Sequence, residues 1–317
     1  MTRRQFLEGV LGGSATAMVT SFSCGPGGNS DLKAIPRRTL GRTGEKLSII
    51  GFGGIVVMNE EQSVANDHVA KAFDRGINYF DVAPTYGNAQ DKLGPALKPY
   101  RDRCFLACKT TQREKAGAEK ELHESLEKMQ TDFFDLYQLH AITTREDVET
   151  AFGPGGAMEV FLKAKEEGKV RFLGFSAHSE EAALLAMEKF EFDTTLFPIN
   201  YVCWQEGHFG AAVVARAKEK QMGILALKAL ASTQIADGQE KPVEKCWYVP
   251  NTDESLQGLA LRWTLSQGTT AAIPPGEPVL FWRAVELAAR AGESLSPTEE
   301  ESLESSAKVL TPLFSTV

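Results

Sequence analysis

Residues 76–87 of this chain read GINYFDVAPTYG, and this stretch decides how the rest of the sequence is interpreted. Its apolar first half predicts a short strand that ends at a carboxylate, Asp81. Pro84 keeps the following backbone extended and Gly87 permits a turn, so a loop follows the strand. That loop carries the phenol of Tyr86. Because a phenol has a pKa of about 10, Tyr86 needs a nearby cation to act as an acid at neutral pH.

Outward from this stretch, strand-like and helix-like segments alternate along the chain. Amphipathic helical patterns are clearest at 63–75, 116–129 and 210–221. Apolar runs of strand length occur at 47–53, 77–81, 104–109, 134–140, 170–175, 194–199, 223–228 and 269–273. Such strand–helix units in about 250 residues predict the α/β fold of a (β/α)8 TIM barrel.

A doubly wound open sheet is the alternative fold. No predicted strand runs into a GxGxxG turn, which is the usual dinucleotide-binding fingerprint of that fold. Residues 37–47 alternate around a glycine-containing turn and predict an N-terminal β-hairpin. We therefore expect one barrel domain over 31–317. Within it, the irregular segment 232–251 falls where barrel enzymes carry substrate loops, and Ser296 begins a last helix.

The first 30 residues predict a separate signal segment. Arg3 and Arg4 form a twin-arginine pattern, and a weakly apolar run rich in glycine and alanine follows over 10–22. This pattern is typical of proteins exported in the folded state, so it predicts the export machinery as a partner and a periplasmic or cell-envelope location. A disordered basic tail on a cytoplasmic protein is the alternative. Lipid attachment at Cys24 stays open, because the residues before it match a lipobox poorly.

The composition argues against several classes of function. The formal net charge of −8 and the lack of a basic stripe argue against a nucleic-acid partner. No apolar run approaches the roughly 20 residues that a membrane helix needs. The 5 cysteines lack CxxC and Cys/His metal spacing, so neither a metal site nor a disulfide framework is predicted.

The candidate catalytic residues stand where predicted strands end, because barrel enzymes place their chemistry at the carboxyl ends of strands. The second, third and fourth strands end at Asp81, Lys109 and His140, which brings an acid, a cation and an imidazole to one rim. We expect Lys109 to lower the pKa of Tyr86, and Asp81 to hold Lys109. His140 would orient a carbonyl oxygen. Together these residues predict proton donation to an alkoxide that forms as hydride reaches carbon. Taken singly, Asp81 or Lys109 is as consistent with a solvated charge at the rim, and His140 with a structural histidine.

The motifs around these residues resemble those of the aldo/keto reductase family. They are RTLGRTG at 38–44, NYFDVAPTYG at 78–87, Lys109 with its flanking strand, DLYQLH at 135–140 and GKVRFLGFS at 168–176. The resemblance implies a barrel enzyme without a Rossmann motif that transfers hydride between NAD(P)(H) and an aldehyde, a ketone or the corresponding alcohol. It also implies a catalytic tetrad of Asp81, Tyr86, Lys109 and His140, with Tyr86 as the general acid/base.

The resemblance implies cofactor contacts as well. Ser176 matches the family serine that hydrogen-bonds the nicotinamide carboxamide, and Asn200 keeps its family position. Lys228 stands near the usual aromatic platform, where it either meets a phosphate or is a rim charge. Pro275 and Gly276 keep the turn before a helix N-terminus, which suits a phosphate group. The nearest cation after that turn is Arg283.

Three positions depart from the family pattern. Ala177 stands for the asparagine beside the serine, and Leu196 stands for the glutamine of the sixth strand. Glu277 replaces a basic residue of NADP-preferring members and would repel a 2′-phosphate, so NADP(H) and NAD(H) both stay open. Because an exported enzyme has no obvious pool of reduced nicotinamide, we hypothesise a tightly bound cofactor acquired before export. No iron–sulfur cluster is expected, because no cysteine follows Cys246.

Two other functions stay open beside the leading prediction of carbonyl reduction. One is a redox-sensing or ligand-binding barrel that retains its cofactor with little turnover. The other is an epimerase or eliminase that uses the same tetrad on a sugar-like substrate.

Overall fold

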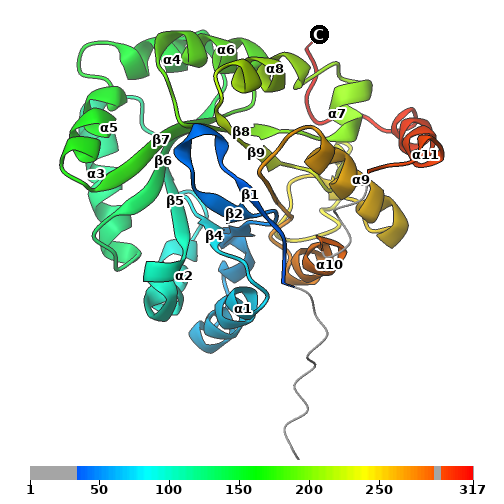
Figure 1. Cartoon of the computed structure of the whole chain (residues 1–317), viewed down its shortest axis with the longest axis horizontal. Helices are drawn as coiled ribbons and strands as arrows, with labels where there is room; N and C mark the ends of the chain where they lie inside the picture. Colours follow the sequence, from blue (N-terminus) through cyan, green and yellow to red (C-terminus); the bar gives the residue numbers. More distant parts are fainter. Residues whose placement is uncertain (1–33, 289–293, 317) are drawn as a thin grey trace, which may run out of the picture. The chain divides into compact units, whose positions relative to one another are not determined.

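The computed structural model describes residues 34–288 and 294–316 (Figure 1), so the predicted signal segment and Cys24 lie outside the described residues. Eight of the described strands form one parallel sheet, in the order β12-β9-β8-β7-β6-β5-β4-β3. Their bounds are β3 (Phe52–Gly53), β4 (Tyr79–Asp81), β5 (Phe105–Thr110), β6 (Phe134–Ile142), β7 (Val170–Ala177), β8 (Thr194–Pro198), β9 (Gly223–Leu227) and β12 (Ala271–Ile273).

The two edges of this sheet meet and close it into a barrel. The backbone N–H of Gly51 donates to the carbonyl of Ala272 at 2.9 Å, and the N–H of Ala272 donates to the carbonyl of Ile49 at 2.9 Å. A parallel bridge between Ile50 and Ala272 lies at the same place. The predicted (β/α)8 TIM barrel is therefore confirmed, and the open-sheet alternative is wrong.

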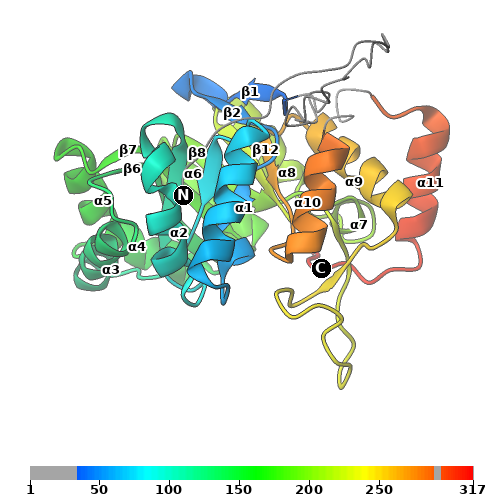
Figure 2. The same cartoon turned by 90° about the horizontal axis from the view of Figure 1, so that it is seen from below.

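Helices surround the strands on the outside of the barrel (Figures 1 and 2). The α-helices are α1 (Gln62–Asp74), α2 (Ala89–Leu97), α3 (Lys115–Lys128), α4 (Arg145–Phe152), α5 (Ala157–Glu166), α6 (Glu180–Lys189), α7 (Tyr201–Gln205), α8 (Ala211–Glu219), α9 (Glu254–Ser266), α10 (Pro278–Ala288) and α11 (Pro297–Ala307). The three helices predicted from periodicity correspond to α1, α3 and α8. The side chain of Ser296 caps α11 through a capping box, as the sequence predicts. No described helix is long and apolar enough to cross a membrane.

The N-terminal hairpin consists of β1 (Arg37–Thr39) and β2 (Lys46–Ser48), joined around the 3-10 helix η1 (Gly41–Thr43). The prediction of one strand over 47–53 is wrong, because this run is divided between β2 and β3. Ser48 accounts for the break: its backbone N–H donates to Oδ1 of Asn78 at 2.7 Å, and its hydroxyl donates to the carbonyl of Ile50 at 2.7 Å. These bonds turn the chain out of the hairpin before it joins the barrel.

The barrel interior is filled with apolar side chains at its hairpin end. Inward-facing residues of the strands form a buried cluster with Leu40 and Leu47 of the hairpin. The strand residues of this cluster are Tyr79, Phe105, Ala107, Leu136, Leu196, Leu225, Ala271 and Ile273. Because side chains alternate along a strand, Asp81, Lys109 and His140 face the same interior further along, toward the opposite end. The packed end thus leaves the carboxyl ends of the strands for chemistry.

The segment 232–251, predicted to be irregular, is closed at its base by a short pair of strands. β10 (Ala231–Thr233) pairs antiparallel with β11 (Val249–Pro250), and the chain between them projects away from the hairpin end (yellow in Figure 2). Lys245 ties this segment to the first strand–helix connection, since its ammonium donates to Glu60 at 2.8 Å and to the carbonyl of Val56 at 3.0 Å. Val56 belongs to the 3-10 helix η2 (Gly54–Val57), and the remaining described one is η3 (Lys98–Arg103).

Candidate active site

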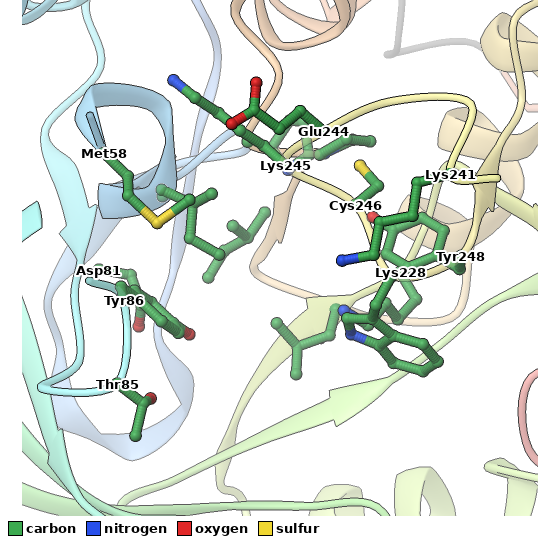
Figure 3. A pocket seen from close by; sticks show the side chains of 18 of the residues that line it. Met58, Asp81, Thr85, Tyr86, Lys228, Lys241, Glu244, Lys245, Cys246 and Tyr248 are labelled. Atoms are coloured by element: carbon green, nitrogen blue, oxygen red, sulfur yellow. The ribbon is translucent and has the colours of Figure 1, made fainter. Parts of the chain in front are cut away.

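A cavity of about 500 Å³ opens at the carboxyl ends of the strands. Asp81, Tyr86 and His140 contribute to one part of its lining, and Lys228 and Tyr248 contribute to another. Figure 3 shows Asp81 and Tyr86 on one wall and Lys228 and Tyr248 on the wall across from it. A concave pocket of this size, with apolar walls and a few convergent polar groups, suits a small-molecule site.

A fully buried ion pair lies beneath the cavity. The ammonium of Lys109 donates to a carboxylate oxygen of Asp81, and the two side chains are 0% and 1% exposed. The same ammonium donates to the carbonyl of Val82 at 3.2 Å, and the hydroxyl of Tyr79 donates to Asp81 at 3.1 Å. Burial lowers the pKa of Lys109, but Asp81 and Tyr86 together outweigh burial, so the pKa is raised. Lys109 therefore stays cationic at neutral pH.

Tyr86 lies above this pair. The Lys109 ammonium is 5.5 Å from the centroid of the Tyr86 ring. Burial raises the pKa of Tyr86, and the charge of Lys109 opposes that rise without reversing it. The charge of Lys109 thus acts on the pKa of Tyr86 in the expected direction, but the loss of solvent outweighs it. Tyr86 is protonated at neutral pH, which is the form that a proton donor requires.

His140 faces Tyr86 edge to face, with ring centroids 5.8 Å apart and planes at 87°. Burial, followed by the charge of Lys109, lowers the pKa of His140 to about 3. The imidazole is therefore neutral in the physiological range. Its Nδ1 is buried and has no hydrogen-bond partner among the described residues. A neutral imidazole beside the phenol can donate one hydrogen bond to a substrate oxygen without competing for its proton.

The end of β6 is held by residues that the sequence did not single out. Arg113 donates to the carbonyl of His140 at 2.8 Å and forms an ion pair with Asp147 at 2.9 Å. Ala141 has a left-handed backbone with φ of 51°, and the β6–β7 register shifts between Leu139 and Ile142. Arg113 stands four residues after Lys109, the last residue of the predicted third strand, and nothing local in the sequence indicates that its side chain reaches the next strand.

The predicted cofactor residues divide into two groups. Lys228, Pro275 and Gly276 line the cavity. The other three predicted residues are not part of the cavity lining, and each makes hydrogen bonds with the backbone. They are Ser176, Asn200 and Arg283. The Ser176 hydroxyl accepts from the N–H of Ala141 at 2.7 Å, the Asn200 amide donates to the carbonyls of Lys228 and Ala231 at 2.9 and 2.8 Å, and Arg283 donates to the carbonyl of Thr252 at 3.3 Å.

The family model for "Aldo/keto reductase family" matches residues 50–281, and the chain belongs to this family. Among curated proteins, it is 33% identical over 167 residues to an L-galactose dehydrogenase of Arabidopsis thaliana, covering 46% of this chain and 49% of that protein. It is 31% identical over 158 residues to the aldo-keto reductase YhdN of Bacillus subtilis, covering 44% and 46%. The chain therefore spans about half the length of the curated relatives that it matches.

Solved structures show the same fold. The holo form of the aldo-keto reductase AKR11C1 from Bacillus halodurans aligns with a TM-score of 0.67 and 21% identity, over 89% of this chain and 100% of that one. A putative aldo-keto reductase from Pseudomonas aeruginosa aligns with a TM-score of 0.67 and 23% identity, over 83% of this chain and 99% of that one. Members of the family are NAD(P)-dependent oxidoreductases of carbonyl compounds, and the chain shares their fold over most of its length.

One end of the cavity suits a phosphate group of a nicotinamide cofactor. The cavity extends from Tyr86 to Pro275 and Gly276, just before α10 begins at Pro278. At Gly276 an added Cβ would lie 2.3 Å from Ile55, so only glycine allows the two segments to approach this closely. A turn at the start of a helix suits a phosphate group, because its backbone N–H groups can donate hydrogen bonds to the anion.

Proposed function

We propose that this protein transfers hydride between a nicotinamide cofactor and an aldehyde or ketone, with Tyr86 as the general acid/base. The observation that carries the proposal is the buried pair of Lys109 and Asp81 directly beneath a protonated Tyr86. The neutral imidazole of His140 beside the phenol supplies the second group that a carbonyl oxygen needs. Three adjacent strands and one loop converge on this single point of the cavity.

When bound, a reduced nicotinamide cofactor would supply a hydride to the carbonyl carbon. As that bond forms, the C=O π pair moves to the oxygen, and Tyr86 gives its proton to this oxygen to complete the alcohol. The phenolate that remains is stabilised by the ammonium of Lys109, and a proton from solvent restores it. His140 holds the oxygen with a hydrogen bond, which strengthens as negative charge develops. In the reverse direction the phenolate removes the hydroxyl proton of an alcohol.

Replacing the Tyr86 hydroxyl tests this proposal. Tyr86→Phe should lower kcat/KM for carbonyl reduction by about 10²- to 10⁴-fold, the usual contribution of a positioned general acid. Tyr100→Phe is a matched control, because that ring stacks on Phe73 and is absent from the cavity lining. The assay follows oxidation of NADPH and of NADH over a panel of aldehydes and ketones. A parent protein that binds cofactor but reduces none of them would support the non-catalytic barrel instead.

The cofactor is proposed to be held tightly enough to survive purification. Its seat would be the wall formed by Pro275 and Gly276. The segment 232–251 is tied down close to this wall, because Lys245 donates to the carbonyl of Val56 and the neighbouring Ile55 lies against Gly276. Mass spectrometry after denaturation of the purified protein would identify NADP(H) or NAD(H). Empty protein that binds the added cofactor only at micromolar concentration or weaker would refute tight retention.

We also propose export of the folded protein to the periplasm through the twin-arginine pattern of the first 30 residues, with cytoplasmic retention as the alternative. The sequence at Arg3 and Arg4 supports this. Cell fractionation of the full chain and of the Arg3→Lys/Arg4→Lys double variant tests it. The parent should reach the periplasmic fraction and the variant should stay in the cytoplasm, whereas equal distribution of the two would contradict export by this route.

A further inference from the structure

Lys228 occupies the cavity wall across from Tyr86 (Figure 3). It directly follows β9 and has a left-handed backbone with φ of 64°, an unfavourable conformation for a residue with a side chain. The buried amide of Asn200 holds this turn by donating to the carbonyl of Lys228 at 2.9 Å. The fold therefore maintains an unfavourable conformation that directs a lysine into the pocket.

The ammonium of Lys228 has aromatic neighbours instead of an acidic partner. It lies 4.9 Å from the ring centroid of Trp247 and 4.7 Å from that of Tyr248. It forms no ion pair with any carboxylate in the described ranges, whereas Lys109 pairs with Asp81 and Lys245 with Glu60 in the same region. Burial lowers the pKa of Lys228 to about 8, so the group still carries its charge at neutral pH. A charge in this position lacks a counter-ion from the protein.

The other polar groups around Lys228 do not supply that counter-ion. His178 lines the same cavity and is neutral, because burial and then the charge of Lys228 lower its pKa to about 4. Glu244 lines the rim but is exposed to solvent, and so is Lys241. Two further titratable neighbours in the lining are the thiol of Cys246 and the phenol of Tyr248, and burial raises the pKa of both. This wall therefore favours an anion from outside the protein.

The charge of Lys228 acts on the catalytic end of the cavity. It contributes to the lowered pKa of His140, after burial and the charge of Lys109, and it also affects His178. An anion bound at Lys228 would thus share the cavity with a carbonyl group held between Tyr86 and His140. The phosphate groups of a cofactor are expected at the backbone turn of Pro275 and Gly276, so the ammonium of Lys228 is left for a small anionic group such as a carboxylate.

We infer that the substrate is an oxo acid, whose carboxylate binds Lys228 while its carbonyl group meets Tyr86 and His140. This inference rests on the proposed function, because it names the substrate class of the same site. Lys228 is then the residue that determines specificity for an acid over a neutral carbonyl compound. His178 lines the same cavity, and its neutral imidazole is a second polar group for the carboxylate.

Matched substrates test the inference. The probes are 4-oxobutanoate and butanal, which differ in the terminal carboxylate, together with longer pairs of oxo acid and aldehyde. The parent should have the higher kcat/KM for the oxo acid. Lys228→Met should lower the ratio of the two kcat/KM values by about 10- to 100-fold, mainly through KM, as expected for a lost hydrogen bond to a charged group. Lys228→Arg should restore part of the ratio. Lys115→Met, at an exposed lysine outside the cavity lining, should leave the ratio as in the parent.

A binding measurement separates this inference from the proposed function. Titration calorimetry with butanoate should show binding to the cofactor-loaded parent and at least tenfold weaker binding to Lys228→Met, even if no carbonyl compound is turned over. Equal butanoate affinity in the two proteins overturns the inference. An unchanged ratio of the two kcat/KM values in Lys228→Met also overturns the inference. If the affinity for NADPH or NADH falls while that ratio stays the same, Lys228 serves the cofactor and not the substrate. Unfolding midpoints of the variants show whether each one is folded.

Discussion

Removing the buried cation should destabilise the protein strongly. In Lys109→Met, Asp81 keeps its carboxylate at 1% exposure without a partner charge. Breaking a buried pair by removing one partner costs about 3–5 kcal/mol. The hydrogen bond from Tyr79 to Asp81 at 3.1 Å is made in both proteins, so it does not enter the difference. We therefore expect the free energy of unfolding to fall by about 3–5 kcal/mol.

Urea unfolding at neutral pH measures this loss. The midpoint should fall while the slope stays near that of the parent, because the surface exposed on unfolding is nearly the same. The double variant Lys109→Met/Asp81→Asn should regain much of the stability, since it buries neither charge. The matched control is Lys115→Met, which breaks the exposed pair with Glu159 and should leave the midpoint unchanged within error.

The double-mutant cycle also defines the outcome that would refute the reasoning. If Lys109→Met shifts the midpoint no more than Lys115→Met does, the pair of Lys109 and Asp81 is hydrated in the folded protein. Additive effects of the two single substitutions would lead to the same conclusion, because paired buried charges must couple. In either case the electrostatic account of Tyr86 would lose its basis.

Three further predictions concern the rest of the cavity. The pKa of His140 is lowered to about 3, against about 6.5 in the unfolded chain, so between these values only the unfolded chain binds this proton. The free energy of unfolding should therefore rise with pH over that range, by up to about 1.4 kcal/mol per pH unit. In urea unfolding at several pH values, His140→Gln should remove this part of the slope. An unchanged slope would contradict the lowered pKa of His140. Gly276→Ala should cost about 1–3 kcal/mol, because its Cβ would lie 2.3 Å from Ile55, whereas Gly258→Ala in α9, with its nearest contact at 3.5 Å, should be neutral or stabilising in the same assay. Lys245→Met should speed limited proteolysis between residues 234 and 248 while the barrel stays intact, because it removes the contacts with Glu60 and Val56. Lys241→Met is the control. If Lys245→Met is cleaved no faster than Lys241→Met, these contacts do not hold the segment.

The sequence predicted those parts of the molecule that depend on local pattern. Alternation along each strand places Asp81, Lys109 and His140 on the interior face, and the barrel brings the ends of neighbouring strands together. The same alternation would have indicated Tyr79, two residues before Asp81, as an inward-facing neighbour. Helices with a clear apolar face were located to within a few residues, because burial of that face determines where they form.

The missed features depend on contacts between distant residues. The break in 47–53 comes from Ser48 and Asn78, which are 30 positions apart. Asn200 was expected at the cofactor, but its amide is engaged by the backbone at Lys228 and Ala231, across another strand. The net direction of the Tyr86 pKa depends on how much of the ring the surrounding loops bury, and no local pattern contains that information.

The most direct test of the account is single-turnover hydride transfer from reduced cofactor already bound to the protein. Parent and Tyr86→Phe would be mixed with a carbonyl substrate in a stopped-flow instrument, with deuterated cofactor to identify the hydride step. The account predicts that Tyr86→Phe slows this step by about 10²- to 10⁴-fold while cofactor affinity stays the same. Hydride transfer at the parent rate in Tyr86→Phe would contradict the role of Tyr86 as the proton donor.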